Sequence, residues 1–190
     1  MGRLQRHADS NTTAVTTFVQ VLCRHGVLMG SIALVLALIA GGAVLMPVLD
    51  PLVQGPLPYV IALAVIVALF LGYLRFRSFH NARYQWSWIA YLFYISVVEE
   101  VAFRLYLPAM LETAAGATAA VLLSNALFGA LHYFTLRWKF SHCVVTGLGG
   151  VGLSRLLETS GDLVLVTLVH FVATFLNTPR APEASTKVRV

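Results

Sequence analysis

The sequence predicts an all-α protein, a polytopic membrane helix bundle with about six transmembrane helices. Of the 190 residues, 58% are hydrophobic and only 11% are charged, and the mean hydropathy is +0.80. Such values lie outside the range of ordinary soluble domains. Apolar runs long enough to cross a bilayer as helices recur along the chain, separated by charged, proline or glycine residues.

The expected helices follow from these breaks in order. The first two runs are divided by Asp50-Pro51 and Pro56-Leu57-Pro58, and the last two by the turn-like Ser160-Gly161-Asp162. Basic clusters separate the second run from the third and the fourth from the fifth. The six helices expected are Val27–Leu49, Leu57–Leu74, Trp86–Leu111, Ala117–Phe134, Phe140–Leu157 and Leu163–Asn177.

The distribution of basic residues predicts the direction of these helices. They gather before the first helix (Arg3, Arg6, Arg24), after the second (Arg75, Arg77, Arg83), after the fourth (Arg137, Lys139) and after the sixth (Arg180, Lys187, Arg189). By the positive-inside rule, both termini of this multi-pass cell-membrane protein are cytoplasmic. The expected domains are a cytoplasmic N-terminal segment (1–26), a transmembrane domain (27–178) and a flexible C-terminal tail (179–190).

Several other classes of protein fit the sequence poorly. No basic run is interleaved with exposed aromatic residues, so the expected environment is the lipid bilayer and no nucleic-acid partner is expected. Cys23 and Cys143 form neither a disulfide framework nor a metal-spaced cluster. The first 25 residues do not resemble a cleaved signal peptide, because no small-residue cleavage site follows a short apolar core.

The third expected helix carries two adjacent carboxylates, Glu99 and Glu100, with Arg104 one turn further on. An ionised side chain at bilayer depth costs at least ~2.5 to 3.5 kcal/mol on insertion scales. A helix-stabilising pair between Glu100 and Arg104 would account for one carboxylate and leave Glu99 over. Intramembrane ionisable residues are functional by default, so these three residues are expected to belong to a site.

Two histidines lie in the other apolar helices, His132 in the fourth and His170 in the sixth. Together with the carboxylates and the arginine, they can satisfy their polarity only in a shared, hydrated cavity. The remaining histidines are expected elsewhere. His7, His25 and His80 are expected at solvent or interface positions, and His142 near a helix end.

Such a cavity suits hydrolysis. Glu99 or Glu100 could remove a proton from water that His132 orients, and a donor on the sixth helix could stabilise the oxyanion formed at an amide. Two histidines and a carboxylate could also hold zinc. However, there is no HExxH helix, and Arg104 would oppose a divalent cation, so no metal or other cofactor is expected.

The order EExxxR, FxxxH and a later helix with a histidine resembles the CAAX protease and bacteriocin-processing family of intramembrane glutamic proteases, also called the Abi family. The similarity covers about residues 94–177, including the Thr159-Ser160-Gly161 turn. Each motif is short, and their order within consecutive apolar helices makes the combination specific. The resemblance implies a membrane endopeptidase that acts without a cofactor.

The resemblance also implies a role for each site residue. Glu99 corresponds to the glutamate that activates water, and Glu100 and Arg104 complete the same motif. His132 corresponds to the histidine that helps hold this water. His170 corresponds to the histidine associated with the oxyanion hole.

The chain departs from the family pattern at two positions. Thr174 stands where the family usually has asparagine, and its hydroxyl can donate one hydrogen bond to an oxyanion. Asn177 lies two turns from His170 on nearly the same face and is the alternative donor. Leu105 follows the arginine where glycine is frequent, which affects substrate preference more than fold.

Three functions are compatible with the sequence. The first is an endopeptidase cutting near a membrane-embedded or lipid-modified C-terminal segment of a protein substrate, and the others are a non-catalytic binding or immunity protein and a small proton-coupled transporter. Counting from Trp86, Glu99 would lie about 20 Å along its helix, in the outer half of a hydrocarbon core of about 30 Å. This depth predicts an outward-opening site and an exported protein as substrate, although His132 is placed nearer the cytoplasm by Arg137 and Lys139.

Overall fold

The computed structural model describes residues 4–6, 15–77 and 82–182, and almost all of this chain is helical. No strand occurs in these ranges, and an isolated antiparallel bridge pairs Gln5 with Trp138. The prediction of an all-α bundle is confirmed. His7 and His80 lie outside the described residues.

The first long helix starts at Phe18, earlier than the expected Val27. It runs without a break through α1 (Phe18–Val21), a π-helical turn (Leu22–Gly26) and α2 (Val27–Ala40). Thr17 and Gln20 form a capping box at its start, in which each side chain accepts a hydrogen bond from the other's backbone N–H.

The end of this helix also differs from the expectation of a single helix to Leu49. Gly41, with φ of 73°, ends α2 because this backbone conformation suits glycine. A 3-10 turn (Gly42–Val44) and the short α3 (Met46–Gln54) follow. Gly41-Gly42 was the available signal for this turn, but apolar residues continue on both sides of it.

Two long helices follow along the chain. α4 spans Leu57–Arg77. A second unbroken helix then runs through α5 (Ala82–Glu100), a π-helical turn (Val101–Tyr106) and α6 (Leu107–Ala115), and it exceeds the expected Trp86–Leu111 at both ends. The π-helical turn follows directly after the two glutamates.

The last three helices agree closely with the expectation. They are α7 (Ala117–Thr135), α8 (Phe140–Ser160) and α9 (Leu163–Asn177). Glycine marks two of the ends, with Gly116 before α7 and the left-handed Gly161 after α8. Asp162 caps α9 by accepting a hydrogen bond from the Leu165 N–H at 2.9 Å.

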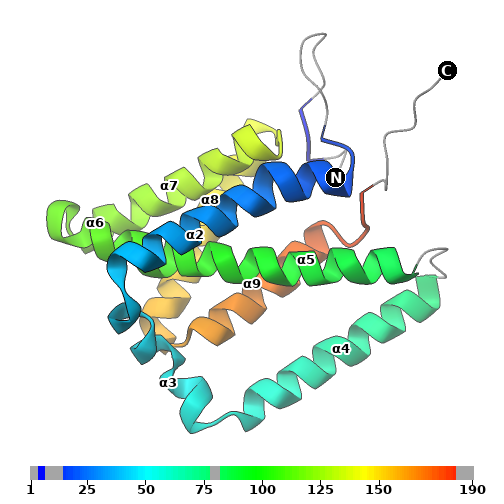
Figure 1. The fold of residues 1–190 in the computed structure, drawn as a ribbon, viewed down its shortest axis with the longest axis horizontal. Helices are drawn as coiled ribbons and strands as arrows, with labels where there is room; N and C mark the ends of the chain where they lie inside the picture. The colour runs from blue at the N-terminus through cyan, green and yellow to red at the C-terminus, as the bar shows by residue number, and fades with distance from the viewer. Residues whose placement is uncertain (1–3, 7–14, 78–81, 183–190) are drawn as a thin grey trace.

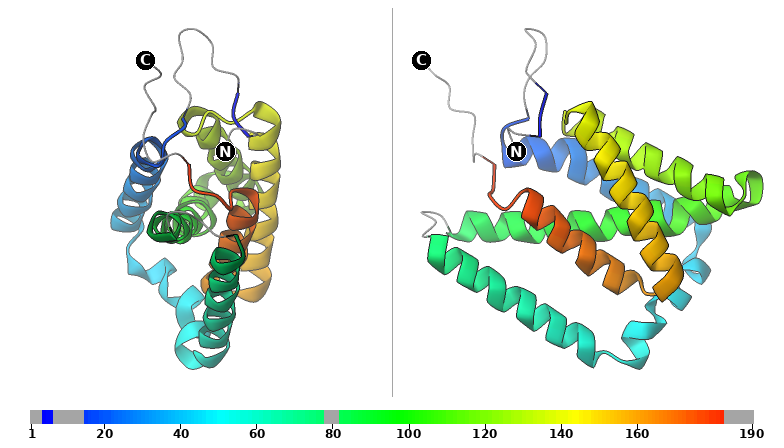
Figure 2. Two further views of the ribbon diagram at one scale, coloured as in Figure 1. Left: turned by 90° about the vertical axis from the view of Figure 1, so that its right-hand side faces the viewer. Right: turned by 180° about the vertical axis from the view of Figure 1, so that it is seen from behind.

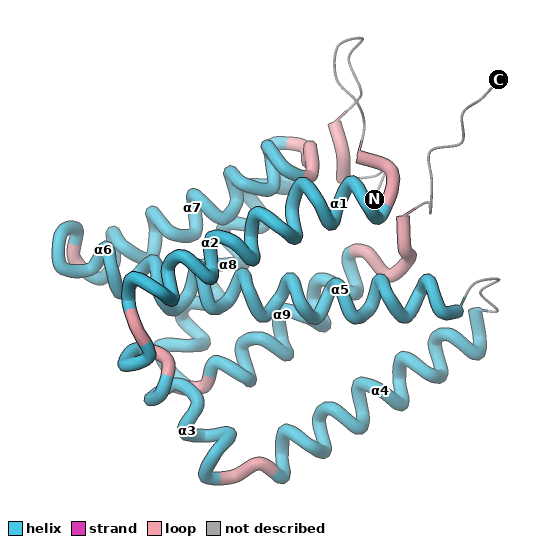
Figure 3. The backbone as a smooth tube through the Cα atoms, in the orientation of Figure 1, coloured by secondary structure: helices cyan, strands magenta, loops and turns pink. Residues whose placement is uncertain are grey.

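The helices surround α5, which lies between the first helix and α9 (Figures 1 and 2). α7 and α8 pack against each other on one side, and α4 diverges from the bundle along its lower edge in Figure 1. The tube in Figure 3 shows how few residues of the drawn chain lie in loops between helices. The described residues contain three helices that are long and apolar enough to span a membrane, namely Phe18–Ala40, Leu57–Phe76 and Ala117–Thr135. The number of six crossings remains a prediction.

Polar and apolar side chains are distributed as in a membrane protein. Large apolar residues of α2, α4 and α8, such as Leu38, Leu69 and Leu148, are exposed on the outside. Several charged or polar residues, including Glu99, Glu100 and Arg104, are buried inside. The interior therefore contains groups that a bilayer would exclude.

The two chain ends pack against the same end of the bundle. The Arg6 N–H donates to the Arg137 carbonyl at 2.8 Å, and the Lys139 N–H donates to the Leu4 carbonyl at 2.8 Å. The Gln85 side chain binds the backbone of Pro179 and Ala181. The start of the expected flexible tail is therefore anchored, and residues 183–190 lie outside the described part.

Candidate active site

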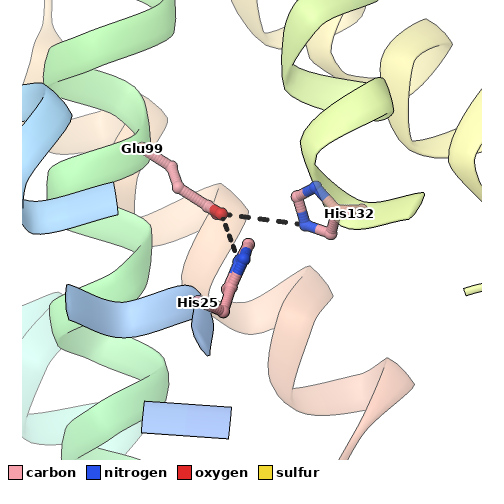
Figure 4. A group of neighbouring side chains, drawn as sticks. All are labelled: His25, Glu99 and His132. Carbon is pink, nitrogen blue, oxygen red and sulfur yellow. Dashed lines mark hydrogen bonds and ion pairs between the residues drawn. The ribbon is translucent and has the colours of Figure 1, made fainter. Parts of the chain in front are cut away.

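Three histidines from three helices surround the Glu99 carboxylate, which is 2% exposed. His25 Nε2 lies 2.9 Å from Glu99 Oε1, and His132 Nε2 lies 3.7 Å from the same oxygen (Figure 4). His170 Nε2 lies 3.7 Å from the other carboxylate oxygen, Oε2. The first helix, α7 and α9 thus each direct one imidazole to the Glu99 carboxylate on α5.

Glu100 forms a second polar group beside the first. Its Oε1 lies 2.6 Å from His170 Nδ1 and 3.4 Å from Arg104 Nε. The guanidinium of Arg104 also lies over the Phe128 ring, 4.0 Å from its centroid. Arg104 is therefore the partner of Glu100, and its side chain is fixed from two sides.

The hydrogen bonds of the histidine Nδ1 atoms determine which nitrogen carries the proton. His132 Nδ1 faces the Phe128 carbonyl at 2.9 Å, which can only accept. The Thr135 hydroxyl gives its proton to the Leu131 carbonyl at 2.6 Å, so it must accept from His25 Nδ1 at 2.7 Å.

The third histidine also donates from its Nδ1 atom. The Glu100 carboxylate accepts from His170 Nδ1. All three imidazoles consequently donate a hydrogen bond from the outer Nδ1 atom. At 2.9 Å from Glu99 Oε1, the His25 Nε2 atom shares a proton with that oxygen, whereas His132 and His170, when neutral, direct an Nε2 lone pair toward the carboxylate at 3.7 Å.

π-helical turns occur in both helices that form the His25–Glu99 contact, namely the first helix and the helix that contains α5. One contains His25, and the other begins at the residue after Glu100. Each changes the register between the helical segments on its two sides, and such turns are frequent at functional sites.

A cavity of about 300 Å³ adjoins these residues. Glu99, His25, His132 and His170 line it together with Arg104. The rest of its wall is largely apolar and aromatic, including Trp88, Tyr91, Leu92, Ile95, Phe128 and Trp138. An apolar cavity with a few convergent polar groups is the usual form of a binding or catalytic site.

The structure brings together five of the six predicted site residues, namely Glu99, Glu100, Arg104, His132 and His170. The sixth, Thr174, lines the same cavity from α9, as does its alternative Asn177.

The prediction for His25 was wrong. It was expected at a solvent or interface position, yet it is 2% exposed and makes the shortest contact to Glu99. The error came from starting the first helix at Val27. The capping box of Thr17 and Gln20 was the available signal, because a helix that starts there places His25 about two turns inside it.

Small residues allow the helices to approach closely behind the site. A Cβ added to Gly150 of α8 would collide with the Asn125 amide oxygen and lie 2.7 Å from Arg104 Nη2. Asn125 in turn donates a hydrogen bond to the Ser154 hydroxyl at 2.9 Å. Gly150 therefore leaves room for the side chains that lie behind Glu100.

Comparison with known proteins identifies the family. Residues 81–176 match the family described as type II CAAX prenyl endopeptidase Rce1-like, and the chain belongs to this family of membrane proteases. The matched stretch contains every site residue predicted from the sequence but not His25. Searches of curated proteins and of solved structures found no match.

Proposed function

We propose that this protein is an intramembrane endopeptidase that cleaves a peptide bond near the membrane-associated C-terminal segment of a protein, with water activated by Glu99. The observation that carries the proposal is the position of the Glu99 carboxylate, which faces three imidazole Nε2 atoms at the wall of the cavity. The family match supports a protease of the CAAX type.

The geometry suits a water molecule between Glu99 and His132. His132 Nε2 and Glu99 Oε1 are both acceptors and lie 3.7 Å apart, so they need a donor between them. Water supplies two O–H groups. As its oxygen attacks the peptide carbonyl, one proton passes to Glu99, which then delivers it to the nitrogen of the departing amine.

The oxyanion requires a hydrogen-bond donor on the other side of the substrate carbonyl. Neutral His170 presents a lone pair at Nε2, because its Nδ1 proton is bound by Glu100. The Thr174 hydroxyl and the Asn177 amide line the cavity from the same helix and can donate without a change of charge. We propose that His170 orients the two glutamates while Thr174 or Asn177 supplies the donor.

Replacing Glu99 tests this mechanism. Glu99→Gln retains the shape of the side chain and removes the base, so cleavage should fall by at least ~10². Glu112→Gln is a matched control, because Glu112 is exposed further along the same unbroken helix. Turnover is measured on purified protein, and substrates are found by comparing C-termini of membrane proteins in cells that carry either variant. Unchanged C-termini and undiminished binding of a captured protein would favour the non-catalytic alternative.

The location of the cavity bears on the side from which substrate enters. Four of its α5 residues, from Trp88 to Ile95, lie between Glu99 and the Ala82 end of the helix, and Trp138 and Thr178 line it at the same end. Arg24 and Lys139 lie at this end of the bundle. By the positive-inside rule, we propose that the site opens to the cytoplasm.

This proposal reverses the outward opening expected from helix depth. That expectation measured depth from Trp86 along a membrane-normal helix, whereas the helix begins at Ala82 and the cavity extends back from Glu99. Lys139→Cys and Ser160→Cys, in a chain without Cys23 and Cys143, test the direction with an impermeant thiol reagent. In intact cells, only the Ser160→Cys protein should be labelled. Labelling of Lys139→Cys alone would restore the outward opening.

A further inference from the structure

A second cavity lies between α7 and α8 and shares no lining residue with the cavity at Glu99. Its volume of about 640 Å³ is within the ~300–1,000 Å³ range of small-molecule sites. The wall is largely apolar, and its bulkier residues are exposed on the outside of the bundle, among them Leu122, Phe134, Phe140, Val144 and Leu148. We propose that this groove binds one anionic phospholipid, with an acyl chain between the two helices and the phosphate at the basic side chains near their connecting loop.

The groove follows from the close approach of α7 and α8 at two glycines. A Cβ added to Gly129 would lie 2.7 Å from the Cys143 carbonyl oxygen. One added to Gly147 would lie 3.2 Å from the Asn125 carbonyl oxygen. Larger apolar side chains such as Phe134 flank this contact. A recess with a backbone floor and apolar sides suits a hydrocarbon chain.

The length of the groove matches one leaflet of a bilayer. Its lining on α8 runs from Phe140 to Val151, about 17 Å at 1.5 Å per residue, and on α7 from Leu122 to Phe134, about 18 Å. Half of a hydrocarbon core of about 30 Å is about 15 Å. A transmembrane helix of a partner or of a second copy crosses both leaflets, whereas an acyl chain occupies one. The length therefore favours a lipid.

Four basic residues gather where the groove ends at the loop between α7 and α8. The guanidinium of Arg6 lies over the ring of Tyr133, 3.7 Å from its centroid. The Nη2 atom of Arg24 donates a hydrogen bond to the Phe134 carbonyl at 3.3 Å. Tyr133 and Phe134 both line the groove, and the other two basic residues belong to the loop itself. This basic cluster consists of Arg6, Arg24, Arg137 and Lys139.

The basic cluster has no acidic counterpart among the described residues. None of its side chains forms an ion pair with a carboxylate in residues 4–6, 15–77 and 82–182. The carbonyls that Arg6 and Arg24 contact at the end of α7 carry only partial negative charge. The positive-inside rule alone predicts basic residues on one side, so the proposal depends on their position at the end of an apolar groove.

The charge of the cluster predicts a preference among lipids. Each lysine or arginine near an anionic lipid headgroup strengthens binding by about fivefold. A zwitterionic headgroup carries no net charge and gains little from the same side chains. Two basic residues acting together therefore account for a preference of at least ~10-fold for an anionic lipid.

The experiment uses the full chain, purified in detergent and delipidated. The probes are phosphatidylglycerol and phosphatidylcholine with the same acyl chains. Native mass spectrometry counts the bound lipids, and thermal unfolding measures the stabilisation that a ligand of the folded state produces. We expect one phosphatidylglycerol per chain, bound at least ~10-fold more tightly than phosphatidylcholine. Glycerol phosphate, which lacks the acyl chains, should not compete.

Substitutions in the groove and in the basic cluster test the two halves of the site. Ala126→Phe places a ring in the groove, and displacing two buried methylene groups should weaken phosphatidylglycerol binding by about 10-fold. Leu127→Phe is the matched control, because Leu127 is exposed on α7 but does not line the groove. Lys139→Gln should weaken phosphatidylglycerol binding by about fivefold and leave phosphatidylcholine binding unchanged. Arg155→Gln, at an exposed position near the other end of α8, should change neither.

Thermal unfolding without added lipid reports the folding of each variant. Equal binding of both lipids in several copies would show an ordinary lipid annulus and overturn the site, as would undiminished binding to folded Ala126→Phe. If that variant does not fold, the exposed Lys139 decides, since equal affinity of Lys139→Gln for phosphatidylglycerol would remove the headgroup contact. Pairs of chains without lipid would mean that a second copy occupies the groove. None of these measurements depends on hydrolysis, so they stand apart from the test of Glu99.

Discussion

α4 and α5 are neighbours in sequence with opposite characters. α4 meets the length and hydropathy criteria of a membrane span, and only 6% of its most apolar window is buried. α5 is not among the three spans recognised in this way, yet it is surrounded by other helices and carries Glu99 and Glu100. Of these two neighbours, hydropathy selects the exposed helix α4, whereas both glutamates lie on α5, whose apolar character they interrupt.

The largest expected difference between the unbroken helix that contains α5 and the helix α4 is in the free energy of unfolding when one arginine of each is replaced. Arg104→Met should lower the free energy of unfolding by about 3–5 kcal/mol, because it leaves Glu100 buried without its ion-pair partner. Arg75→Met, at an exposed position on α4, should change it by no more than about 0.5 kcal/mol. Denaturant unfolding in detergent measures both. Equal stability would show that the Glu100–Arg104 pair does not hold the interior together.

Two glycines of α8 offer a smaller test of how tightly the interior is packed. Gly150→Ala should cost about 1–3 kcal/mol, since the new methyl group displaces Asn125 and Arg104, both held by other contacts. Gly152→Ala, where no atom lies within 4 Å of the added Cβ, should gain up to about 1 kcal/mol from helix propensity. Thermal unfolding of the two variants gives the comparison. Equal shifts would mean that α8 is not closely packed behind the site.

The smallest effect is expected on the exposed apolar surface of α4. Leu69→Ala, at a side chain that is 66% exposed, should change the free energy of unfolding by no more than about 0.5 kcal/mol. Leu92→Ala, at a side chain of α5 that is 2% exposed, should cost about 2–5 kcal/mol. A large loss from Leu69→Ala would mean that this face of α4 meets protein rather than lipid.

The sequence predicted most of the architecture because apolar runs and their punctuation are local signals. Leu163–Asn177 and the start of α7 at Ala117 were predicted to the residue, where Asp162 and Gly116 mark the boundaries. The start of the first helix was predicted too late, because a polar, threonine-rich segment precedes the apolar run. The turn at Gly41 was missed because the residues around it are as apolar as the helix.

The candidate site was predictable where a charge lies inside an apolar run. Glu99, His132 and His170 all met this condition. His25 did not, because it adjoins Arg24 at the boundary of the apolar segment and resembles an interfacial residue. The Arg24 side chain donates a hydrogen bond to the Thr135 carbonyl at 3.2 Å, while the adjacent His25 side chain is buried inside the bundle. The packing of the first helix against α5 and α7 places His25 inside the bundle.

The site has one member near the start of the chain and one near its end, His25 and His170. A ribosome that adds about 5–20 residues per second needs on the order of 10 s to pass from one to the other. Throughout this interval the nascent chain contains Glu99 but does not yet contain His170. The protein is therefore expected to remain inert during its own synthesis, and hydrolysis can begin only when the final helix has entered the membrane.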